Sequence, residues 1–258
     1  MNGSTKSFRS SDDILISYRE WGGEDDPFPP VILHHGFAAD AEANWVRPGV
    51  VAALVAAGRR VLAPDARGHG GSEKPHDPAR YGEERMARDL AGLLDVLGAG
   101  QIDLVGYSMG AIVSLILASG EPRVRRLVVG GVGSGVIECG GVDRRAISSE
   151  AIIGALTAED PAGIAEPGAA AFRRLADALG ADREALVAQA RSIYRGRIAL
   201  ESISAPTLVL AGDADPLAIR PEVLSEAIPD ARLQIVGGDH MAAVVDPRFS
   251  ESIVAFLA

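Results

Sequence analysis

The chain of 258 residues carries 35 acidic and 25 basic side chains, a formal net charge of −10 at pH 7. Nucleic acid and anionic membranes would repel such an acidic surface, so the charge argues against both as partners. With 47% hydrophobic and 23% charged residues, the composition is that of a globular protein, long enough for one α/β domain or two small domains.

Cysteine usage and hydropathy limit where the protein works. Cys139 is the only cysteine, so no intrachain disulfide can form, and no strand-to-helix turn surrounds it that would activate its thiol. No stretch approaches the ~18 apolar residues of a membrane span. Residues 1–10 lack the apolar centre of a signal peptide. We therefore expect a cytoplasmic protein, while the sequence leaves its oligomeric state open.

The first half of the chain alternates between strand and helix signals. Alternating apolar residues and a turn at residues 11–13 predict one or two strands within residues 6–21, followed by a loop rich in Pro and Asp at residues 24–30. The elements predicted next are strand 31–33, helix 45–57, strand 60–63, helix 83–97, strand 102–105, helix 111–119 and strand 124–129. This alternation predicts a mostly parallel sheet covered by helices on both faces.

The pattern changes after a glycine-rich stretch at residues 130–135. Residues 144–199 show only short amphipathic helices. The alternation then resumes with strand 207–211, helix 221–227, strand 232–236 and helix 247–257. We therefore expect a core formed by residues 1–132 and 204–258, with residues 133–203 inserted as a helical cap near the carboxyl ends of the strands, where open α/β sheets hold their sites.

The most informative motif is Gly-Tyr-Ser-Met-Gly at residues 106–110, between a predicted strand and a predicted helix. A sharp strand-to-helix turn strains the serine and lifts its hydroxyl clear of the sheet, and small flanking residues let strand and helix pass closely. The helix also aims free N–H groups at the same point. The context predicts that Ser108 is a catalytic nucleophile; an ordinary turn is the alternative reading.

A serine nucleophile needs a base, and His240 is the best candidate among five histidines. It is the only one that lies late in the chain, on a loop directly after a predicted strand. His35 is a second candidate base, although a structural role in its loop fits it better. A metal site built from His34 and His35 is disfavoured, because adjacent residues rarely converge on one ion and no cluster of Cys or carboxylates accompanies them.

The acid that orients His240 is expected after the strand at residues 207–211, where Asp213 and Asp215 compete. Such a carboxylate accepts the imidazole N–H and fixes its tautomer. We favour Asp215, because the turn after Gly212 can swing it under the histidine, and the chain order Ser, Asp, His is a known triad order. Asp213 is then a turn residue that binds backbone N–H groups.

An oxyanion needs two preset hydrogen-bond donors. The N–H of Met109, directly after the serine, is one candidate. The N–H of Phe37 is the other, because the segment His34-His35-Gly36-Phe37 follows an early strand. Nothing in this arrangement requires a cofactor or a metal ion.

Five segments in this order resemble the α/β-hydrolase family over essentially the whole chain. They are residues 35–37, 65–72, 106–110, 212–215 and 238–240. The resemblance implies an eight-stranded, mostly parallel sheet with a helical cap. It also implies the roles given above to Ser108, Asp215, His240, Phe37 and Met109.

The nucleophile narrows the reaction that the resemblance implies. Similar proteins that open epoxides use aspartate where this chain has Ser108, so a serine points to hydrolysis of a carboxylic ester or thioester of a small-molecule substrate. The Ala-, Ile- and Leu-rich cap implies an apolar pocket. The alternatives are a C–C bond hydrolase of a ring-fission diketone, with Arg144, Arg145, Arg173 or Arg174 binding its carboxylate, a cofactor-free perhydrolase, and a small-molecule receptor on the same fold.

Overall fold

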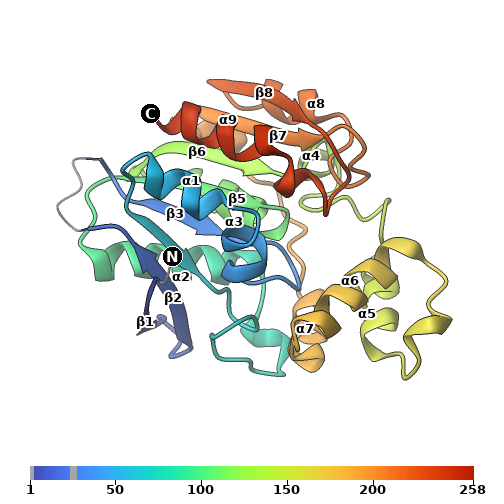
Figure 1. Cartoon of the computed structure of the whole chain (residues 1–258). Coiled ribbons are helices and arrows are strands. Elements are labelled where there is room, and N and C mark those ends of the chain that lie inside the picture. Colours follow the sequence, from blue (N-terminus) through green and yellow to red (C-terminus); the bar gives the residue numbers. More distant parts are fainter. Residues whose placement is uncertain (1–2, 24–27) are drawn as a thin grey trace.

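In the computed structural model, which describes residues 3–23 and 28–258, one eight-stranded sheet forms the centre of the molecule (Figure 1). The strands are β1 (Ser4–Arg9), β2 (Leu15–Trp21), β3 (Val31–His34), β4 (Val61–Pro64), β5 (Ile102–Tyr107), β6 (Val124–Gly130), β7 (Thr207–Gly212) and β8 (Ala231–Val236). Their order is β1-β2-β4-β3-β5-β6-β7-β8, with β1–β2 and β2–β4 antiparallel and the other pairs parallel. The predicted eight-stranded, mostly parallel sheet is confirmed.

Helices cover both faces of this sheet. The core helices are α1 (Val50–Ala56), α2 (Glu83–Leu97), α3 (Met109–Ala118), α8 (Pro221–Glu226) and α9 (Pro247–Leu257). Helices α1 and α9 pack together on one face, and α2 packs on α3 on the other (Figure 1). Along β5 the side chains of Ile102 and Leu104 point to the α2–α3 face, whereas those of Val105 and Tyr107 point to the α1–α9 face. This double burial explains why the central strands are apolar runs rather than alternating ones.

The prediction of one helix over residues 45–57 is wrong for residues 45–49. A separate π-helical turn spans Glu42–Val46, and α1 begins only at Val50. Pro48 has no N–H to donate to a helix ladder, and Gly49 adopts φ 87°, a left-handed conformation that ends the first turn. Of the predicted loop at residues 24–30, residues 24–27 lie outside the described part of the chain.

Residues 133–203, all of which the structure describes, form helices and no strand. The helices are α4 (Gly135–Glu138), α5 (Ser149–Thr157), α6 (Pro167–Ala178) and α7 (Arg183–Ala190). The side chains of Ser148, Glu166 and Asp182 accept hydrogen bonds from the first free N–H groups of α5, α6 and α7. These three helices lie together beside the sheet (Figure 1) and share a small apolar cluster with Ala38 and Leu217 of the core.

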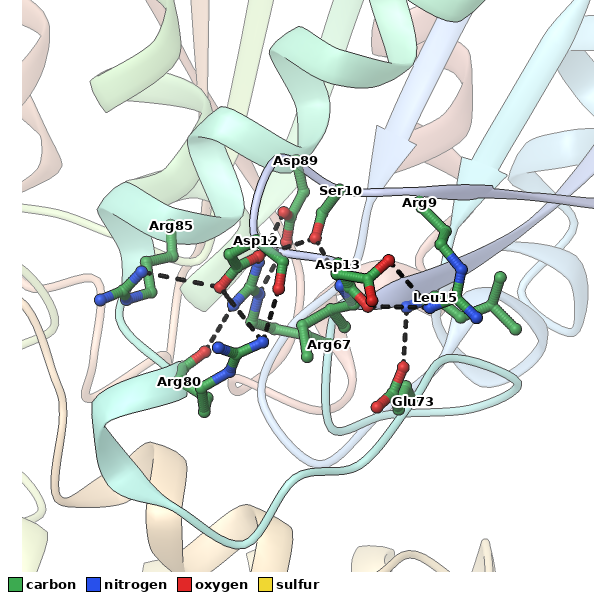
Figure 2. Close-up of polar contacts among 11 residues, drawn as sticks. Arg9, Ser10, Asp12, Asp13, Leu15, Arg67, Glu73, Arg80, Arg85 and Asp89 are labelled. Carbon is green, nitrogen blue, oxygen red and sulfur yellow. Dashed lines mark hydrogen bonds and ion pairs between the residues drawn. The ribbon is translucent and has the colours of Figure 1, made fainter.

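The Arg67 guanidinium joins three distant segments (Figure 2). It donates to Asp89 of α2 at 2.7 and 2.8 Å, to Asp12 of the β1–β2 turn at 2.8 and 2.9 Å, and to the Arg80 carbonyl oxygen at 2.6 Å. The hydrogen bonds from Arg67 hold the pKa of the Asp12 carboxyl well below its usual range. Arg67 is itself buried, so its charge is balanced within the protein rather than available to a ligand.

Over residues 3–23 and 28–258, no helix is long and apolar enough to cross a membrane.

Candidate active site

Ser108 occupies the turn between β5 and α3 in a strained conformation. Its backbone adopts φ 55° and ψ −116°, which few residues other than glycine reach. The conformation is held by its own N–H, which donates to the Gly130 carbonyl at 2.8 Å, and by its carbonyl, which accepts from the first turn of α3. Strain that the surroundings enforce in this way is typical of functional positions.

The two glycines of the motif are required by close packing. A Cβ on Gly106 would overlap the Gly110 carbonyl oxygen, and a Cβ on Gly110 would overlap the carbonyl oxygens of His34 and His35. Helix α3 therefore begins against β5 and the loop after β3 at a distance that only glycine allows. This contact fixes where the serine side chain points.

The structure brings Ser108, His240 and Asp215 together, although 132 and 25 residues separate His240 from them. The distance from His240 Nε2 to Ser108 Oγ is 2.9 Å. His240 Nδ1 lies 3.0 and 2.9 Å from the two carboxylate oxygens of Asp215. Each of the three residues is at most 7% exposed, so water is largely kept from the hydrogen bonds that join them.

The backbone positions His240 and Asp215 from neighbouring elements. Asp215 follows β7 and accepts a hydrogen bond from Leu217 N–H at 2.8 Å through Oδ1. His240 follows β8, and its carbonyl oxygen accepts from the Tyr107 hydroxyl at 2.7 Å. Burial raises the pKa of Tyr107 well above its usual value, so the phenol stays protonated and remains a donor.

Two neighbouring aspartates, the candidate Asp213 and also Asp239, bind the backbone instead of His240. Asp213 accepts from Gly238 N–H at 2.8 Å, which ties the loop after β7 to the loop after β8. Asp239 accepts from the N–H groups of Met241 and Ala242 at 3.0 and 2.9 Å. Of the two candidates left open by the sequence, the structure therefore places Asp215 against the imidazole and Asp213 in the turn.

The loop after β3 passes directly beside Ser108. Gly36 lies so close that a Cβ there would be 3.3 Å from the Ser108 Cβ. His35 does not approach Ser108 as a base: its Nδ1 lies 2.8 Å from the Gly36 carbonyl oxygen, and its Nε2 accepts from Ala66 N–H at 2.9 Å. Neither Phe37 N–H nor Met109 N–H donates to another group within the described residues, so both are free donors next to Ser108.

Two cavities meet at Ser108 and share Phe37 and Phe172 in their walls. The first, of about 60 Å³, lies on the Met109 side, and the second, of about 160 Å³, lies on the His240 side. We call them the Met109-side cavity and the His240-side cavity. Phe172 comes from α6, so the helical segment contributes to the walls of both cavities.

Several polar residues at these cavities were not predicted from the sequence. Asn44 lines the His240-side cavity, and its Oδ1 accepts from Gly36 N–H at 2.9 Å. Gln189, Ser149 and Glu83 line the Met109-side cavity, and burial raises the pKa of the Glu83 carboxyl. No local signal distinguishes Asn44, because Asp40, Glu42 and Arg47 are polar residues of the same segment.

Comparisons with known proteins agree with this architecture. A family model described as the alpha/beta hydrolase fold matches residues 29–134. The crystal structure of a hydrolase from Pseudomonas aeruginosa PA01 aligns over 99% of both chains, with a TM-score of 0.80 and 28% identity. The chain has the α/β-hydrolase fold.

Two curated relatives match shorter segments. A 2-hydroxy-6-oxo-2,4-heptadienoate hydrolase of Pseudomonas putida F1 is 43% identical over 103 residues, which is 40% of this chain and 37% of that protein. An sn-1-specific diacylglycerol lipase of Mus musculus is 42% identical over 119 residues, which is 45% of this chain and 36% of that protein. The match thus spans little more than a third of the length of these relatives.

Proposed function

We propose that the protein is a serine hydrolase that cleaves a carboxylic ester or thioester of a small molecule through an acyl-enzyme. The observation that carries this proposal is the unbroken hydrogen-bond chain from Asp215 through His240 to Ser108 Oγ. A hydroxyl needs a base in contact to become a nucleophile, and the base needs a partner that fixes its tautomer. The three side chains supply these functions in that order.

The geometry supports the following steps. Ser108 Oγ attacks the substrate carbonyl carbon while its proton moves to His240 Nε2, and Asp215 stabilises the imidazolium. The N–H groups of Phe37 and Met109 donate to the oxygen that becomes negative. His240 then gives the proton to the leaving alcohol or thiol as its bond to the carbonyl carbon breaks. Water, deprotonated by His240, then attacks the acyl-enzyme; the acyl–Oγ bond breaks, His240 returns the proton to Ser108 Oγ, and the acid leaves.

The two cavities separate the two parts of the substrate. His240 must protonate the leaving group, and it lines only the His240-side cavity. We therefore assign the leaving group to the 160 Å³ cavity and the acyl group to the 60 Å³ Met109-side cavity. Since an apolar cavity of about 150 Å³ holds a benzene ring, the acyl group is expected to be short.

A second candidate is hydrolysis of a C–C bond in a diketone acid. The name of the Pseudomonas putida relative favours it, and so does Arg144. This arginine lines the Met109-side cavity and contacts no carboxylate in the described part of the chain. By contrast, Arg145 pairs with Asp143 and Glu138, and Arg173 pairs with Asp177, so these two guanidinium groups are engaged within the protein.

Hydrolysis of nitrophenyl esters from acetate to long-chain acyl groups tests the first candidate. We expect turnover of the short esters, with a kcat at least about 10⁴-fold lower in Ser108→Ala. The matched control is Ser250→Ala, a half-buried serine on α9 that lines neither cavity. If wild type hydrolyses no ester but cleaves a ring-fission diketone, the C–C candidate replaces ester hydrolysis.

A further inference from the structure

Gln189 brings an unused hydrogen-bond acceptor to the Met109-side cavity. It lies on α7, is 2% exposed and lines the cavity together with Ser108 and Met109. Its Nε2 lies 3.0 Å from Met109 Sδ and 3.7 Å from Met86 Sδ. A thioether can accept a hydrogen bond but cannot donate one, so the nitrogen end of the amide belongs on the sulfur atoms. The oxygen end, Oε1, is buried without a partner.

Two unused donors lie in the wall of the same cavity. Ser149, at the start of α5, is 6% exposed, and its hydroxyl has no hydrogen-bond partner in the described part of the molecule. The Nε of Arg144 is also buried and unpaired, while its Nη2 donates to the Cys139 carbonyl at 3.0 Å. Three side chains from separate segments thus leave one acceptor and two donors unsatisfied around one small cavity next to the nucleophile.

Such a set of groups indicates a polar ligand rather than a hydrocarbon chain. A plain alkyl chain offers none of the three buried groups a partner, whereas a polar ligand can pair with them once their side chains turn toward the cavity, whose surface is otherwise almost wholly apolar. A site whose buried polar groups match a substrate hydroxyl discriminates strongly against the analogue that lacks it. A hydroxyl fits the set because it can donate to Gln189 Oε1 and accept from Ser149 or Arg144.

We propose that the Met109-side cavity selects acyl groups that carry a hydroxyl, with Gln189 and Ser149 as specificity-determining residues. This inference rests on the proposed ester hydrolysis, because it assigns the acyl group to that cavity. A carboxylate fits less well. It would accept from Ser149 and Arg144, but it would face the lone pairs of Gln189 Oε1 and the buried carboxyl group of Glu83.

Matched ester pairs test the proposal, because a hydroxyl and a methyl group are similar in size. The first pair is nitrophenyl 3-hydroxypropionate and nitrophenyl butyrate. The second pair is nitrophenyl lactate and nitrophenyl isobutyrate. The mono-nitrophenyl ester of succinic acid supplies the carboxylate. For each pair, the ratio of kcat/KM is measured in wild type and variants, so that the intrinsic reactivity of each ester cancels between enzymes.

In at least one pair, we expect Gln189→Leu to lower the ratio of kcat/KM for the hydroxyl ester to kcat/KM for the methyl ester about 10-fold. We expect Ser149→Ala to lower the same ratio. One tenfold change corresponds to about 1.4 kcal/mol. Gln101→Leu, the same substitution at an exposed position, is the matched control. Thermal unfolding of each variant checks that it is folded, and Ser149→Ala keeps the test open if Gln189→Leu does not fold.

The outcomes separate this proposal from the proposed function. Ratios that stay unchanged in both Gln189→Leu and Ser149→Ala would overturn hydroxyl selection while leaving ester hydrolysis intact. A preference for the succinate ester that disappears in Arg144→Met would also overturn it, in favour of a carboxylate site. If wild type hydrolyses none of these esters and none of the unsubstituted series, the proposed function itself is wrong.

Discussion

At the scale of single residues, Asp213 and Asp215 form an internal comparison. Asp215 contacts His240 Nδ1, whereas Asp213 only accepts from Gly238 N–H. Asp215→Asn keeps the shape but can present an amide N–H to His240, which favours the wrong imidazole tautomer. We expect it to lower kcat for esters about 10³- to 10⁴-fold, and Asp213→Asn to lower it less than tenfold. Equal losses in steady-state assays of the two folded variants would contradict the assignment.

His69 makes stability depend on pH. Burial and the neighbouring His35 lower the pKa of His69 from 6.5 to about 3. Below pH 6.5 the unfolded chain takes up a proton here that the folded chain does not, so stability falls as the pH falls towards 3 and is constant above 7. At pH 5 this one group accounts for a loss of about 2 kcal/mol.

Urea unfolding of wild type and His69→Gln at pH 7 and pH 5 tests this linkage. Glutamine can replace both hydrogen bonds of His69, to Ala38 N–H and the Arg67 carbonyl, without titrating. We expect the loss between pH 7 and pH 5 to be smaller in His69→Gln by about 2 kcal/mol. The exposed His76, whose pKa its bond to Asp182 raises, is the control. His76→Gln should leave the loss equal or slightly larger.

At the scale of elements, the contact between α3 and the β3 loop depends on Gly110. A Cβ there meets backbone oxygens, which cannot turn aside as a side chain would. We expect Gly110→Ala to destabilise the fold by at least about 3 kcal/mol, with loss of any esterase activity. Gly154, exposed within α5, has open space around it, and Gly154→Ala should stabilise by about 0.5–1 kcal/mol. Thermal unfolding of the two variants checks both signs.

The elements differ in how far the sequence alone predicts them. Helix α2 begins and ends at the predicted residues, because its apolar side chains recur at helical spacing and Gly98 ends it in a left-handed conformation. The start of α1 was missed, because the apolar Trp45 and Val46 fit a helix while Pro48 and Gly49 break it. Local spacing thus predicted the type of element better than its interruption.

The same limit applies to the site. The backbone path from β5 to α3 is a local property, so Ser108 could be found in the motif, and the strand order then brings the ends of β7 and β8 to it. The choice between Asp213 and Asp215 depended on one turn and needed coordinates. Gln189 and Ser149 could not be predicted, because their positions follow from how α5 and α7 pack, which no local pattern in the sequence records.

At the scale of the whole molecule, a buried cluster around Asp103 connects the loop before β3 with the end of α9. Asp103 lies in β5, is fully buried and forms ion pairs with Arg59 and Arg125. The Arg59 guanidinium also donates to the carbonyl oxygens of Pro29 and Leu257, at 2.8 and 2.7 Å. The loop before β3, the centre of the sheet and the end of α9 therefore meet at one carboxylate.

Removal of that carboxylate should lower the stability of the fold far more than loss of an exposed ion pair does. In Asp103→Asn, the Arg59 charge stays buried at 4% exposure without its counter-charge, which typically costs about 3–5 kcal/mol. For a chain of this size we expect Tm to fall by about 10 °C. The control Asp95→Asn breaks the pair between Arg123 and a 70% exposed carboxylate and should change stability by less than about 1 kcal/mol. Similar Tm values for the two variants would mean that Asp103 does not hold these segments together.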